Sequence, residues 1–176
     1  SLERETEWCE FKHNKMKKED LCKYISALSN SAIISGKEHS YLVFGIKDGT
    51  HEIIGTNFSF NTENVGNDTL LFWLQSRITP SILIEHFHAK FGEKRVEGLR
   101  IGKPYNHPTR FNNRAFIRND SSLGELSNYS EKERTIWNYL KTTSFENSLA
   151  KEGMDLGKIS DYFNINELIM GLSEGR

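Results

Sequence analysis

Residues 41–50 read YLVFGIKDGT, and this stretch decides the class of fold. Its first six residues form an almost continuous apolar run rich in strand-forming types, which is typical of a central strand covered on both faces. Asp48 and Gly49 follow, and Asp-Gly is the strongest short hairpin signal because both residues tolerate a positive φ. We therefore expect a strand at 41–46, a turn, and a returning strand at 51–54.

The segments on either side predict the rest of the domain. Residues 8–12, WCEFK, indicate a short strand with Phe11 on one face and Glu10 and Lys12 on the other, because side chains alternate along a strand. A helix capped by Asn14 is expected over residues 15–31, where apolar residues recur at helical spacing. A second helix is expected at 68–77, followed by strands at 82–91, 95–101 and 114–118. This order predicts an α+β fold, in which helices pack on a mixed, mostly antiparallel sheet.

The C-terminal third differs in composition. Residues 121–130 are rich in Ser, Gly and Asn and are interpreted as a linker, after which helices are expected at 131–141 and within 153–170. The tail from Thr142 is too small to bury a core of its own. We therefore expect a first domain over residues 1–125 and, over 126–176, a linker and short helical extension, which either packs on the first domain or is the start of a truncated downstream domain.

Composition limits the classes of protein. The 176 residues are 36% apolar and 27% charged, as expected for one globular domain. The longest apolar run has five residues, so neither a membrane-spanning helix nor a secretory signal is expected. With only two cysteines and no CxxC motif, a disulfide framework or zinc finger is disfavoured, and a cytoplasmic location is expected.

The net charge of −1 hides a gradient along the chain. Residues 1–118 hold 17 basic and 14 acidic side chains, whereas residues 119–176 hold 6 and 10. Basic residues gather at 12–23 and again at 90–118, and each cluster is either a solvated face or a phosphate-binding surface.

Three carboxylates, Glu5, Glu10 and Asp48, lie where apolar structure begins or ends. Converging carboxylates bind Mg²⁺ or Mn²⁺, but Glu5 can approach Glu10 only if the chain bends between residues 6 and 8. From spacing alone, a solvated acidic segment and an ordinary turn Asp explain them better. Lys12 beside Glu10 is, by the same reasoning, a surface ion pair or a group that polarises a phosphate.

Histidines and loop aromatics leave similar alternatives. His86 and His88 share a strand face, and hydrogen-bonded, half-buried side chains are favoured over a metal site because no third ligand is evident. Tyr105 and Phe111 stand among Arg residues in a loop, where they either stack on bases or pack on their own domain. Glycine motifs that bind phosphate, GxxxxGK[ST] and GxGxxG, are absent from the sequence.

Taken in order, these segments resemble the Schlafen AlbA-like domain over about residues 3–125. The resemblance rests on Glu5-Thr-Glu-Trp-Cys-Glu-Phe-Lys12, Ile25-Ser-Ala-Leu-Ser-Asn-Ser31, Tyr41-Leu-Val-Phe-Gly-Ile-Lys-Asp-Gly49, Ile78-Thr-Pro80 and Ala115-Phe-Ile-Arg118. In place of the Gly-Gly that the family often carries before its central strand, this chain has Ile34-Ser-Gly-Lys-Glu-His39.

The resemblance implies binding of RNA or DNA, and in some relatives a metal-dependent endonuclease that cuts structured RNA such as transfer RNA. By position in the motif, Glu5, Glu10 and Asp48 would be the metal ligands for Mg²⁺ or Mn²⁺, and Lys12 would lie beside them. The basic residues expected to contact phosphates are Lys15, Lys17, Lys18, Arg100, Lys103, Arg110, Arg114 and Arg118. The alternatives are a DNA-binding module of a transcriptional regulator and a regulatory or dimerisation unit of a larger ATPase, with a homodimer left open.

Overall fold

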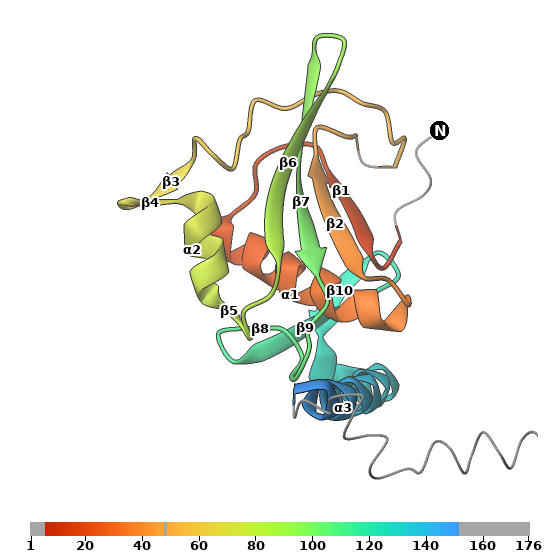
Figure 1. The fold of residues 1–176 in the computed structure, drawn as a ribbon. Helices are drawn as coiled ribbons and strands as arrows, with labels where there is room; N and C mark the ends of the chain where they lie inside the picture. Colours follow the sequence, from red (N-terminus) through yellow and green to blue (C-terminus); the bar gives the residue numbers. More distant parts are fainter. Residues whose placement is uncertain (1–5, 48, 152–176) are drawn as a thin grey trace, which may run out of the picture. The chain divides into compact units, whose positions relative to one another are not determined.

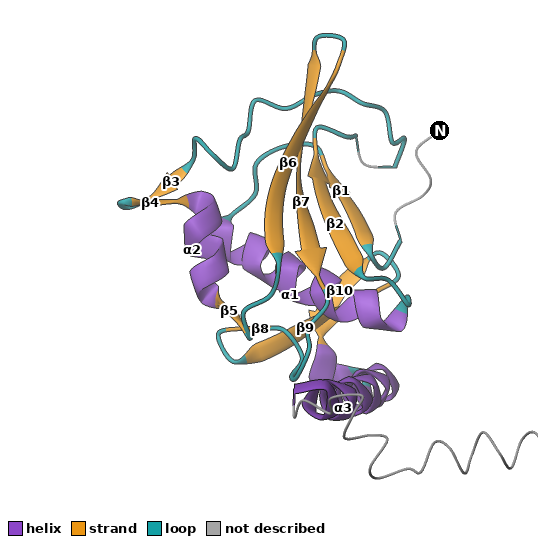
Figure 2. Ribbon diagram, in the orientation of Figure 1, coloured by secondary structure: helices purple, strands orange, loops and turns teal. Residues whose placement is uncertain are grey.

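A four-stranded sheet forms the centre of the domain in the computed structural model, which describes residues 6–47 and 49–151, with side chains up to residue 143. Its strands are β1 (Cys9–Lys12), β2 (His39–Phe44), β7 (Lys94–Gly102) and β6 (Ile84–Phe91), in that spatial order. β1 runs parallel to β2, whereas β2 with β7 and β7 with β6 are antiparallel. The expected α+β fold with a mixed, mostly antiparallel sheet is confirmed (Figure 2).

A second sheet lies on the other side of the long helix α1 (Lys18–Ile34), as Figure 1 shows. It contains β10 (Ser122–Glu125), β9 (Arg114–Asn119), β8 (Arg110–Phe111) and β5 (Ile78–Thr79). The remaining elements are the small ladder of β3 (Asn64–Val65) and β4 (Asp68–Thr69), helix α2 (Leu70–Arg77), a short 3₁₀ turn at Leu126–Asn128, and helix α3 (Ser130–Lys151). The main core lies around α1, where Leu28, Leu42 and Leu99 are fully buried.

The side of α1 that faces the second sheet is polar but completely buried. Ser26, Ser29, Asn30 and Ser31 are all without exposed surface. Asn30 Nδ2 donates to the carbonyls of Thr109 at 2.9 Å and Phe116 at 2.8 Å, and its Oδ1 accepts from the N–H of Thr109 at 2.8 Å. The Ser-Ala-Leu-Ser-Asn-Ser segment therefore bonds the helix to the backbone of the second sheet, since buried polar groups need such partners.

Several predicted boundaries change. The helix starts at Lys18 rather than Lys15, because the backbone of Lys17 is still extended and Asn14 caps only the N–H of Lys15. The returning strand at 51–54 reduces to one bridge between Ile46 and Ile53. Both edges of β2 are already hydrogen-bonded, to β1 and β7, so no third strand can pair with it.

The predicted linker at 121–130 is folded. Residues 122–125 form β10 and pair with β9, and Leu126 is buried with Ile136 and Leu140 of α3. Its Ser-rich composition concealed a strand whose partner is supplied by tertiary structure. Helix α3 contains the predicted helix at 131–141, whereas the helices predicted within 153–170 lie outside the described residues.

The chain divides into two compact units, residues 1–140 and 141–176, and all contacts described below belong to the first. No helix in the described part of the chain is both long and apolar enough to cross a membrane.

Candidate functional site

Glu10, Lys12 and Arg118 form a buried cluster between β1 and β9. Glu10 and Lys12 are two residues apart on β1, so they share a strand face, as predicted, and Lys12 Nζ lies 2.5 Å from Glu10 Oε1. Arg118 enters from β9 and forms an ion pair with Glu10 Oε2. The Lys12 ammonium and the Arg118 guanidinium both lie over the ring of Tyr24 on α1, at 4.8 and 5.7 Å from its centre.

The structure places Arg118 inside the protein and not on the phosphate-binding surface expected from the sequence. Its side chain has no exposed surface, its N–H donates to Ser31 Oγ at 3.0 Å, and its Nη1 donates to the carbonyl of Ser121 at 2.9 Å. The physical reason is Glu10, whose side chain is 3% exposed. A carboxylate that is buried to this extent needs an opposite charge beside it.

Lys12 is the member of the cluster that reaches solvent, with 26% of its side chain exposed. Burial alone would lower the pKa of the Lys12 ammonium, but the hydrogen bond and negative charge of Glu10, with a smaller effect of Tyr24, outweigh it and raise the pKa above 10.5. Lys12 is therefore charged throughout the physiological pH range.

The bend required for a carboxylate cluster is present. The N–H of Thr6 donates to the carbonyl of Cys9 at 3.1 Å, and the N–H of Cys9 donates to the carbonyl of Thr6 at 3.2 Å, so the chain reverses immediately before β1. Glu5 and Asp48 themselves lie outside the described residues.

The described donors do not fit an open metal site. Among residues 6–47 and 49–143, no group of three or more His, Cys, Asp or Glu side chains is arranged to hold a metal ion. Both oxygens of Glu10 face cationic side chains of the protein, whereas Mg²⁺ and Mn²⁺ need several accessible oxygens.

Most of the other predicted phosphate contacts also have acidic partners. The pairs are Lys15 with Glu63, Arg100 with Glu85, Lys103 with Glu38, and Arg114 with Glu125. Burial tends to lower the pKa of Lys103, yet its hydrogen bonds to Glu38 and Tyr139 raise it overall. Lys17, Lys18 and Arg110 make no ion pair within the part of the chain that the structure describes.

Lys18, in the first turn of α1, and Arg77, at the end of α2, both lie over the ring of Trp73. Lys18 Nζ lies 5.0 Å and the Arg77 guanidinium 5.3 Å from the ring centre of Trp73, which is partly exposed. We call Lys17, Lys18, Trp73 and Arg77 the α1–α2 patch. Trp73 lies four residues before Arg77 on α2, a helical spacing that indicates in the sequence that the two side chains could meet.

A pocket of about 330 Å³ adjoins the α1–α2 patch. It is lined by the Lys15–Lys18 segment, the loop at 63–66 and Leu70. Three lysines therefore surround one hollow, and only Lys15 among them has an ion-pair partner, Glu63, within the described residues. The Lys17 ammonium is exposed at this edge.

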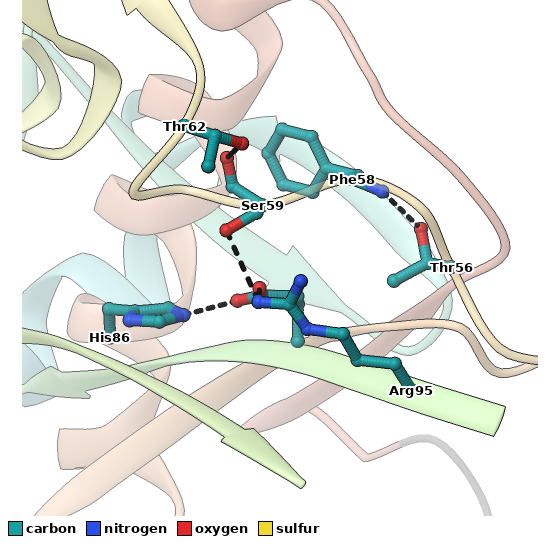
Figure 3. Close-up of polar contacts among 7 residues, drawn as sticks. Thr56, Phe58, Ser59, Thr62, His86 and Arg95 are labelled. Carbon is teal, nitrogen blue, oxygen red and sulfur yellow. Dashed lines mark hydrogen bonds and ion pairs between the residues drawn. The ribbon is translucent and has the colours of Figure 1, made fainter. Parts of the chain in front are cut away.

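A second buried carboxylate, Glu97 on β7, has two basic neighbours. His86 Nε2 is hydrogen-bonded to one of its oxygens, Arg95 forms an ion pair with the other, and Arg95 also donates to Ser59 Oγ at 3.3 Å (Figure 3). His86 is thus hydrogen-bonded, as expected, while His88, which stacks on it, is exposed. This cluster fastens the loop around Ser59 to the central sheet. Of the two aromatic residues noted near Arg110, Phe111 is a core residue and Tyr105 is exposed.

Comparison with known proteins decides the family. The family model described as Schlafen, AlbA_2 matches residues 5–127. The chain belongs to the Schlafen AlbA_2 family. No curated protein matches the sequence. Among solved structures, the chain resembles the DIP2311 protein from Corynebacterium diphtheriae at 18% identity and a TM-score of 0.49, over 71% of this chain and 26% of that one. The chain therefore spans about a quarter of that protein's length.

The Schlafen AlbA_2 match confirms the family inferred from the sequence motifs. The matched residues include β1 and β9, which carry Glu10, Lys12 and Arg118, and both helices of the α1–α2 patch. It ends within the 3₁₀ turn, so α3 lies beyond the family domain. The family is associated with nucleic acids, which is the coarsest statement of function that the comparison supports.

Proposed function

We propose that this Schlafen AlbA_2 domain binds nucleic acid, and that the α1–α2 patch contacts the phosphates. The observation that carries the proposal is the charge pairing. Lys17, Lys18 and Arg77 make no ion pair within the described residues, whereas Arg100, Lys103 and Arg114 are each neutralised by a carboxylate.

Unpaired surface cations are the groups that gain most from a phosphate backbone, because binding releases the counterions condensed on the nucleic acid. In the α1–α2 patch, the Trp73 ring lies against Lys18 and Arg77 and limits the freedom of both side chains. Glu19 and Asp20 also lie in the first turn of α1, and Asp20 pairs with Lys23. The local excess of positive charge is therefore small, and binding should be modest and sensitive to salt.

Fluorescence anisotropy with labelled single-stranded RNA, an RNA hairpin and duplex DNA tests this proposal. The Lys18→Ala/Arg77→Ala variant should weaken binding to every nucleic acid that the wild type binds. Arg100→Ala is the matched control, because it removes an exposed cation whose charge is already paired with Glu85. Equal effects of the two variants would refute the placement at the α1–α2 patch. Absence of binding to any of the three at low salt would refute the function and favour a dimerisation or regulatory unit.

A metal-dependent endonuclease is the second candidate, favoured by the chain reversal between Thr6 and Cys9 and by the position of Lys12 beside Glu10. In this version Glu5, Glu10 and Asp48 would hold Mg²⁺ or Mn²⁺, and Glu10 would have to exchange at least one of its cationic partners for the ion. Incubation of labelled transfer RNA with Mn²⁺ or EDTA, with wild-type protein and Glu10→Gln, tests this. Cleavage that needs Mn²⁺ and is lost in the variant supports the endonuclease, and RNA that is bound but never cut supports the binding module.

A further inference from the structure

The cluster around Glu10 already contains the positive charge that a divalent cation would provide. Glu10 is almost completely buried, and its two oxygens face Lys12 and Arg118 separately. The Arg118 side chain is fully buried, and its Nη1 also donates to the carbonyl of Ser121, while its backbone N–H donates to Ser31 Oγ.

The charges of these three side chains sum to one positive charge in a region with little access to water. A divalent cation placed against Glu10 would lie next to the Arg118 guanidinium, and the repulsion between them would be weakly screened. Moving the Arg118 side chain away would break its contacts with Glu10 and Ser121 together. The repulsion from Arg118 and the loss of its contacts both oppose binding of Mg²⁺ or Mn²⁺ at the Glu10 carboxylate.

We propose that Arg118 takes the place of a metal ion at Glu10, and that Glu10 acts as a positioning residue that holds the Lys12 ammonium at the surface for contact with a phosphate. This second part rests on the proposed binding of nucleic acid. Lys12 is suited to the contact because its head group is fixed by Glu10 Oε1 and by the ring of Tyr24, while a quarter of the side chain stays exposed. A cation that is held in place before binding loses less conformational entropy when a phosphate arrives.

The first part is tested by thermal unfolding with and without Mn²⁺, for the wild type and Glu10→Gln. The account predicts that any rise in melting temperature caused by Mn²⁺ is the same in both proteins. A rise that occurs in the wild type and is lost in Glu10→Gln would overturn it. If Glu10→Gln does not fold, the Glu10→Gln/Arg118→Met double variant, which leaves no buried charge of the pair, replaces it.

The second part is tested by the salt dependence of nucleic-acid binding, which a merely structural role would not change. Lys12→Met should lower the slope of log Kd against log salt concentration by about one, and Lys12→Arg should restore it. Glu10→Gln should weaken binding while Lys12 keeps its charge. A slope that Lys12→Met leaves unchanged would overturn the phosphate contact. If the wild type binds no nucleic acid at low salt, the proposed function fails by itself, and the Mn²⁺ experiment still decides the role of Arg118.

Discussion

Asn30 lies in the C-terminal part of α1 and holds the helix to β9 and to Thr109, which immediately precedes β8. Replacing it with Ala removes three hydrogen bonds, two from Nδ2 to the carbonyls of Thr109 and Phe116 and one from the N–H of Thr109 to Oδ1. Water does not reach the site, since Asn30 has no exposed surface. At about 1 kcal/mol for each net hydrogen bond, and about 1–3 kcal/mol for a buried group left without a partner, we expect Asn30→Ala to lower the free energy of unfolding by about 3–5 kcal/mol.

Urea unfolding followed by circular dichroism measures this loss, with Asn61→Ala, a change at an exposed loop position, as the control. The midpoint should fall strongly for Asn30→Ala, while the dependence of the free energy on urea stays the same. A domain of this size has a total stability of about 5–15 kcal/mol, so this loss is a large share of the free energy of unfolding. A loss below about 1 kcal/mol, equal to that of the control, would refute the role assigned to the buried polar side of α1.

Three further results are expected. At pH 8 a thiol reagent should modify Cys9 but not Cys22, because burial, with a smaller effect of Glu19, raises the pKa of the Cys22 thiol to about 12; rapid modification of both thiols in the folded protein would contradict this. The pKa of Lys12 is raised in the folded state, so its contribution to the free energy of unfolding is fully present below pH 10.5 and is lost as the pH rises further. The difference in unfolding free energy between wild type and Lys12→Met should therefore shrink above pH 10.5. A difference that is constant up to pH 12 would exclude this. Leu126→Ala should lower the free energy of unfolding by about 2–5 kcal/mol, because the Leu126 side chain is buried against α3. A negligible loss in urea unfolding would show that residues 121–130 are a linker that does not contribute to the folded core.

Patterns within one segment were enough to predict much of the fold. The alternation in WCEFK placed Glu10 and Lys12 on one face of β1, and the apolar run at 41–46 identified the strand that β1 and β7 flank. The Thr6 to Cys9 reversal lies where the chain would have to bend for Glu5 to approach Glu10, a condition that the sequence stated but could not decide. Each of these features depends on neighbours in the sequence.

Features that depend on distant partners could not be predicted in this way. Arg118 lies near the end of β9 and close in sequence to other basic residues, and nothing near it in the sequence indicates that it pairs with Glu10 inside the protein. Strand β10 has a loop-like composition and is defined only by its pairing with β9. The neutralisation of Arg100 by Glu85 results from the antiparallel register of β6 and β7, in which these two residues lie opposite each other. The clusters of basic residues in the sequence therefore predicted more unpaired positive charge on the surface than the structure has.

The most direct test of nucleic-acid binding at the α1–α2 patch is the salt dependence of the dissociation constant. Three phosphate contacts, from Lys17, Lys18 and Arg77, should contribute about 2–3 to the slope of log Kd against log salt concentration. The Lys17→Ala/Lys18→Ala/Arg77→Ala variant should lose this contribution while keeping the melting temperature of the wild type. A variant that binds with the same affinity and slope as the wild type would contradict the account.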